Sequence, residues 1–130
     1  MPKTKFIGTV NTGQGNGKFF IKLPWVTRQL KELNFTPYIG TLNLHLTPES
    51  TKQRKYLTPQ NGILIKPENG YLPGYLYKAM ISDTKCYVIL PDVPNYPKNL
   101  LEIIAAENLR DLLNVKDGDK IVVIVTTLQN

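Results

Sequence analysis

The sequence has a single cysteine, a single histidine and no long apolar run. One cysteine, Cys86, cannot form an internal disulfide, so we expect a cytoplasmic protein. The lone histidine, His45, has no imidazole partner for a metal site, and we expect it at the surface. No run of about 18 apolar residues is present, and the opening residues MPKTKFIGTV lack the apolar segment of a signal peptide. We therefore expect neither a membrane span nor secretion.

The sequence also lacks a concentrated basic region. The formal net charge is +6, but lysines and arginines are scattered, and KQRK at residues 52–55 is the only dense run. A basic balance suits nucleotides, nucleic acid or other anionic ligands, although a solvated basic surface is the simpler explanation. The scatter argues mildly against a DNA-binding face. A chain of 130 residues predicts one domain, over residues 1–130.

Short apolar runs separated by ten prolines and nine glycines predict many short strands. We expect strands at residues 5–10, 18–23, 41–46, 62–67, 74–81, 85–91 and 120–128, and short helices at 24–34 and 107–114. Residues 91–99, rich in proline, predict a loop. Because strands and helices do not alternate regularly, a small, mainly antiparallel β barrel with short helical insertions is favoured over a doubly wound sheet.

The stretch NTGQGNGKFF, residues 11–20, places glycines at 13, 15 and 17 before Lys18. A Walker-type loop needs four residues between its glycines and a hydroxyl residue after the lysine, but here three residues intervene and Phe19 follows. A dinucleotide fingerprint fails on its spacing and on the missing helix. We expect the loop to join two strands. It is either a cradle of backbone amides for an anion, to which Lys18 adds a charge, or a flexible hairpin tip.

The segment TLNLHL, residues 41–46, alternates strictly between polar and apolar residues. Its three leucines would face the core, whereas Thr41, Asn43 and His45 would share the opposite face. A hydroxyl and an amide oxygen are hard ligands that suit Mg²⁺, which completes its shell with phosphate and water. A polar outer face of a half-buried strand is the alternative.

Two reactive residues lie within apolar runs. Glu102 is the one acid in LLEIIAA, where alternation would turn it to solvent unless it is kept for a task. Cys86 lies in KCYVILP and has no second histidine to pair with, so we expect a core thiol. No serine has the G-x-S-x-G setting of an α/β-hydrolase.

Taken together, GQGNGKFF, PYIGTLNL and LEIIAAENLRDLLNVKDGDKI, in this order, resemble the archaeal-type CTP-dependent riboflavin kinases. The resemblance runs from about Phe6 to Val123. It implies a six-stranded cradle-loop (RIFT-type) barrel, and a flavoprotein that transfers the CTP γ-phosphate to the riboflavin 5′-hydroxyl, giving FMN and CDP. The partners it implies are the small molecules CTP and riboflavin, with Mg²⁺ as cofactor. We expect a monomer, with no nucleic acid and no membrane partner.

The resemblance also implies the site. The family's nucleotide-binding loop corresponds here to Gly13, Gln14, Gly15, Asn16, Gly17 and Lys18, and a second nucleotide segment to Glu107, Asn108, Leu109 and Arg110. The metal pair of the G-T-L-N-L motif corresponds to Thr41 and Asn43. Glu102 would lie near the ribityl end of the flavin, orient the 5′-hydroxyl and accept its proton, and Pro94 would belong to the flavin loop. Either Lys18 or Arg110 would contact phosphate.

Several positions depart from the family pattern. Cys86 and Tyr87 replace a usual glycine–alanine pair, Pro94 and Tyr96 replace a frequent threonine and histidine, and Ala106 replaces a proline. These departures concern the flavin side more than the nucleotide side. The competing interpretation is a cradle-loop barrel without turnover, which binds DNA, a nucleotide or a flavin.

Overall fold

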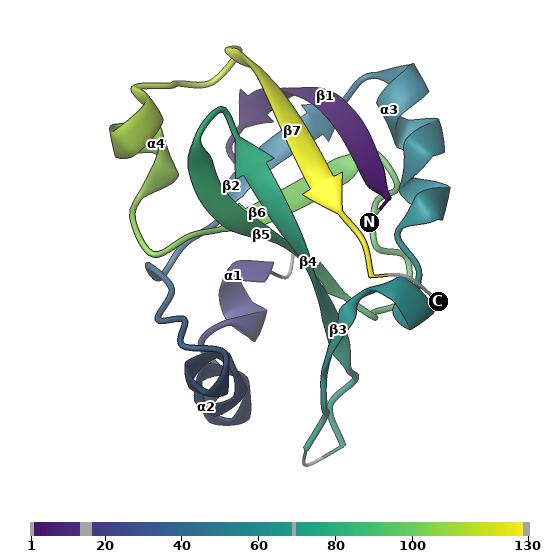
Figure 1. Cartoon of the computed structure of the whole chain (residues 1–130), viewed down its shortest axis with the longest axis vertical. Helices are drawn as coiled ribbons and strands as arrows, with labels where there is room; N and C mark the ends of the chain where they lie inside the picture. Colours follow the sequence, from purple (N-terminus) through teal and green to yellow (C-terminus); the bar gives the residue numbers. More distant parts are fainter. Residues whose placement is uncertain (1, 14–16, 69, 129–130) are drawn as a thin grey trace.

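A computed structural model describes residues 2–13, 17–68 and 70–128 (Figure 1). Its strands are β1 (Lys3–Asn11), β2 (Leu42–Leu46), β3 (Ile63–Ile65), β4 (Gly74–Ile81), β5 (Thr84–Pro91), β6 (Leu100–Ile104) and β7 (Lys120–Thr126). Its helices are α1 (Gly17–Phe20), α2 (Pro24–Glu32), α3 (Pro48–Gln53) and α4 (Leu109–Leu113), with 3₁₀ turns η1 (Arg54–Tyr56) and η2 (Pro59–Asn61). None of the described helices has the length and apolarity needed to cross a membrane.

The strands close into a barrel. They lie in the order β3-β4-β5-β6-β2-β1-β7, and β7 pairs in turn with β4. Every pairing is antiparallel. The closed ring therefore contains β4, β5, β6, β2, β1 and β7. The short strand β3 lies outside the ring and pairs with the first half of β4, whereas β7 pairs with the second half. This confirms the expected six-stranded, mainly β barrel with short helices.

Apolar side chains form two clusters. The barrel interior is filled by residues that include Phe6, Leu44, Tyr77, Val88, Ile103 and Val123. A second cluster lies on the outside, where α1 and α2 pack Phe20, Ile21, Trp25, Val26 and Leu30 against Ile65, Leu76, Ile89 and Ile104 of the sheet. Figure 1 shows α1 directly below the barrel and α2 below α1. Because β6 is covered on both faces, all five of its residues are buried.

The strand and hairpin predicted at residues 18–23 are wrong. Gly17–Phe20 is the short helix α1, and its first residue, Gly17, is buried together with Phe20 and Ile21. This i, i+3, i+4 spacing is helical, and it directs both apolar side chains onto the outer face of the barrel. A short apolar run does not distinguish a strand from a helical turn by periodicity alone. The strand β6 completes the set of seven instead.

Local capping signals account for where three helices begin or end. Helix α2 begins at Pro24, whose missing N–H is not needed in the first turn. The Thr47 hydroxyl accepts a hydrogen bond from the Ser50 amide at 3.1 Å and caps α3. The side chain of Asn108 caps α4 in the same way, and Asn114, at a φ of 53°, ends it in the left-handed conformation.

Candidate functional site

A row of polar side chains crosses three strands on the outer face of the barrel. Asn11 of β1 is paired with Asn43 of β2, and Asn43 is paired with Glu102 of β6. Residues paired in this way project from the same face of a sheet. Although they are polar, Asn43 is only 6% exposed and Glu102 only 1%. Glu102 therefore lies on the outer face of the barrel, but it is buried there and not turned to solvent as the alternation alone would predict.

Two glycines of the loop cover this row. A Cβ atom on Gly13 would lie 1.1 Å from Nδ2 of Asn43, and one on Gly17 would lie 2.7 Å from Oε2 of Glu102. Neither position has room for a side chain. Glycine is therefore needed because the backbone lies against Asn43 and Glu102, and not because the segment is a flexible hairpin tip. Gln14, Gly15 and Asn16, predicted to bind the nucleotide, lie outside the described residues.

The carboxylate of Glu102 receives hydrogen bonds from several segments. The Gly17 amide donates to Oε1 at 3.1 Å and to Oε2 at 3.0 Å. The Tyr96 hydroxyl donates to Oε1 at 2.5 Å, and Oγ1 of Thr41 lies 3.5 Å from Oε2. Burial, and then the charge of Glu102, raise the pKa of Tyr96, so the phenol remains a donor. In this arrangement the Gly17 amide is bound to Glu102, and the phosphate role of the loop amides stays a prediction.

The Thr41 and Asn43 side chains meet as the alternation predicts. Oγ1 of Thr41 donates to Oδ1 of Asn43 at 2.6 Å. Two neighbouring oxygen ligands of an octahedral Mg²⁺ lie about 3 Å apart. Because Oγ1 and Oδ1 are only slightly closer than that, a small movement apart would let both bind such an ion. Residues 2–13, 17–68 and 70–128 contain no group of three or more His, Cys, Asp or Glu side chains that would hold a metal. His45 is exposed, as expected.

These segments surround one pocket of about 380 Å³. Among its lining residues are eight of the predicted nucleotide or metal positions: Gly13, Lys18, Thr41, Asn43, Glu107, Asn108, Leu109 and Arg110. They come from the loop after β1, from helix α1, from the region where β2 begins and from the region where α4 begins. Its volume lies in the range of small-molecule sites. The fold thus gathers, at one end of the barrel, residues that are far apart in the sequence.

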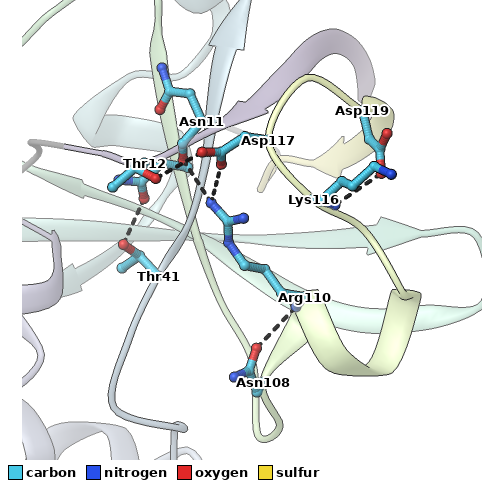
Figure 2. A network of polar contacts seen from close by, with 9 residues as sticks. Asn11, Thr12, Thr41, Asn108, Arg110, Lys116, Asp117 and Asp119 are labelled. Atoms are coloured by element: carbon cyan, nitrogen blue, oxygen red, sulfur yellow. Dashed lines mark hydrogen bonds and ion pairs between the residues drawn. The ribbon is translucent and has the colours of Figure 1, made fainter.

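Arg110 is held by its neighbours, as Figure 2 shows. Its Nη2 donates to the Asn11 carbonyl at 3.2 Å and to Oδ1 of Asp117 at 2.6 Å. The Thr12 hydroxyl donates to Oδ2 of Asp117 at 3.0 Å. The hydrogen bond from Arg110, followed by that from Thr12, holds the pKa of Asp117 below its usual value. Neither Thr12 nor Asp117 was singled out from the sequence. The one local feature that could have drawn attention to Asp117 is its place in KDGD, residues 116–119, which is typical of a turn.

The flavin-side positions do not line this pocket. Pro94 is exposed in the loop between β5 and β6. Cys86, Tyr87 and Ala106 line a separate pocket of about 460 Å³, where the rings of Phe35 and Tyr87 lie 4.9 Å apart. Cys86 is 4% exposed and belongs to the core, as predicted.

Comparison with known proteins identifies the family. The family model CTP-dep_RFKase, described as "Domain of unknown function DUF120", matches residues 10–125. The riboflavin kinase of Pyrobaculum aerophilum is 40% identical over 120 residues, covering 88% of this chain and 57% of the relative. Those of Pyrobaculum calidifontis and Methanosarcina acetivorans are 37% and 38% identical, covering 90% and 88% of this chain. The chain spans 58% and 51% of their lengths. By its sequence, the chain belongs to the CTP-dependent riboflavin kinase family.

Proposed function

We propose that the protein is a CTP-dependent riboflavin kinase, which transfers the γ-phosphate of CTP to the 5′-hydroxyl of riboflavin. The relatives named riboflavin kinase support the reaction class. The observation that carries the proposal is the single pocket lined by Gly13, Lys18, Thr41, Asn43 and residues 107–110, with Glu102 paired to Asn43 at its edge. The proposed substrates are small molecules, and we propose that the protein acts in the cytoplasm as a monomer without nucleic acid.

The nucleotide would lie between the glycine loop and the start of α4. Lys18 lines the pocket with an exposed side chain, which suits a contact to phosphate. Arg110 is already bound to Asp117 and to the Asn11 carbonyl, which favours a bracing role. Of the two residues considered for the phosphate, we therefore assign Lys18.

Thr41 and Asn43 would hold Mg²⁺. When bound, the ion offsets the charge that develops on the phosphate oxygens. Because the hydroxyl and the amide oxygen already lie 2.6 Å apart, the chain needs little rearrangement to present both.

Glu102 would orient the 5′-hydroxyl of riboflavin and accept its proton. In the transfer, the bond between the 5′-oxygen and the γ-phosphorus forms, the bond from that phosphorus to CDP breaks, and the hydroxyl proton moves to the carboxylate. Glu102 is 1% exposed beneath Gly17, so the substrate reaches it only after a covering segment moves. We propose that Pro94, which is exposed in the loop that also carries Tyr96, contacts the flavin.

The test is direct. The protein is incubated with riboflavin, Mg²⁺ and either CTP or ATP, and FMN is separated by chromatography. We expect FMN with CTP and not with ATP. Absence of FMN with either nucleotide, together with tight DNA binding that weakens steeply with salt, would instead support the non-enzymatic barrel.

A further inference from the structure

The loop between β5 and β6 reaches the buried carboxylate of Glu102 through one side chain, Tyr96. The 2.5 Å separation between its hydroxyl and Oε1 is the length of a charge-assisted O–H···O⁻ hydrogen bond. Tyr96 therefore links this loop directly to the row of polar residues.

Arg54 of η1 holds the loop in place. Its Nη1 donates to the carbonyl of Leu100 at 2.5 Å and lies 3.3 Å from that of Lys98. Its guanidinium carbon lies 5.6 Å from the centroid of the Tyr96 ring, within the range of a cation–π contact. Arg54 thus fixes both the backbone that follows Tyr96 and the ring itself.

The two oxygens of Glu102 are not equivalent in this arrangement. The Gly17 amide is nearly equidistant from both, at 3.1 and 3.0 Å, so it does not select one of them. Tyr96 binds only Oε1, whereas Oε2 faces the hydroxyl of Thr41 at 3.5 Å. The described contacts thus distinguish the two oxygens: Tyr96 holds Oε1, and Oε2 lies on the side of the proposed metal pair.

We propose that Tyr96 is a positioning residue for phosphoryl transfer: its hydroxyl anchors Oε1 of Glu102, so that Oε2 is the oxygen presented to the substrate hydroxyl, and Arg54 holds Tyr96 in place. This inference rests on the proposed riboflavin kinase function. It assigns tasks to two residues, Tyr96 and Arg54, that lie outside the 380 Å³ pocket.

The test compares two single-atom deletions. Tyr96→Phe removes the hydroxyl that binds Glu102. Tyr77→Phe is the matched control, because its hydroxyl donates at 2.7 Å to the Thr58 carbonyl, and Tyr77 is 1% exposed. We expect Tyr96→Phe to lower kcat about ten-fold with the KM for CTP unchanged, since a hydrogen bond to a charged group is lost. Tyr77→Phe lowers the melting temperature and leaves kcat unchanged.

A double-mutant cycle separates positioning from mere structural support. If Tyr96 acts through Glu102, Tyr96→Phe has little further effect on kcat in a Glu102→Gln background. An independent readout needs no turnover: the ¹H–¹⁵N resonance of the Gly17 amide, which binds the same carboxylate, shifts in Tyr96→Phe and not in Tyr77→Phe.

The outcomes are distinguishable. Unchanged kcat in Tyr96→Phe, or an undiminished effect in the Glu102→Gln background, overturns the positioning role while FMN production by the wild-type protein preserves the function. A wild-type protein that makes no FMN overturns the proposed function and this inference with it. A ten-fold loss of kcat in Tyr96→Phe that disappears in the Glu102→Gln background supports both.

Discussion

The backbone amide of Gly17 donates to both carboxylate oxygens of Glu102, although the two residues are separated by 85 positions in the sequence. The contact joins the first residue of α1 to the middle of β6. It also explains a glycine at position 17, because any side chain there would enter the space of the carboxylate. The loop and the acid are therefore one structural unit.

Gly17→Ala should inactivate the protein and destabilise it. The added methyl group would lie 2.7 Å from Oε2 of Glu102 and 3.1 Å from Cγ2 of Ile89, and both neighbours are buried. Overpacking of this kind costs about 1–3 kcal/mol, and here it also displaces the acid. Urea unfolding and the rate of FMN formation would measure the two effects.

Gly70→Ala is the control for that substitution. No atom lies within 4 Å of the Cβ position of Gly70, but its φ of 79° disfavours a side chain. We expect a loss of about 1 kcal/mol of stability with normal activity. Normal activity in Gly17→Ala as well would show that Glu102 does not need its present position.

The sequence predicted the barrel but not the way its outer face is covered. The alternation of TLNLHL correctly placed Thr41 and Asn43 on one face, because a half-buried strand has a period of two. The structure of residues 18–23 and the burial of Glu102 could not be predicted in this way. Both depend on α1 packing over β6, and a contact between residues so distant in the sequence leaves no local periodicity. Tyr96 stood out only as a departure from the family pattern, and a lone tyrosine in a proline-rich loop does not by itself indicate a contact to Glu102.

Asn43→Ala should nearly abolish turnover while leaving the fold intact. The substitution removes one of the two proposed metal ligands, and the lost hydrogen bond to Thr41 costs about 1 kcal/mol. Initial rates over a range of Mg²⁺ concentrations, with circular dichroism as the folding check, would measure this. His45→Ala is the control, because it lies on the same strand in an exposed position. Near-normal activity of Asn43→Ala with Mg²⁺ would show that the metal assignment is wrong.

The thiol of Cys86 should react slowly with alkylating reagents in the folded protein. Burial raises its pKa to about 12, so the thiol remains protonated at pH 8 and little of the nucleophilic thiolate is present. We expect iodoacetamide to modify Cys86 at pH 8 only after denaturation, as followed by mass spectrometry. Rapid modification of the native protein would mean that the segment around β5 opens readily.

Lys18 and Lys22 offer a comparison that tests where the phosphates lie. Both lysines are exposed and close in sequence, but Lys18 lines the 380 Å³ pocket and Lys22 does not. If Lys18 contacts a phosphate of CTP, Lys18→Ala raises the KM for CTP about ten-fold, because a hydrogen bond between charged groups is lost. Lys22→Ala changes only the net charge and should leave that KM within two-fold of the wild-type value, as roughly expected for a screened surface charge. Equal effects of the two substitutions would assign the loss to general electrostatic attraction, and Arg110 would then become the better candidate for the phosphate.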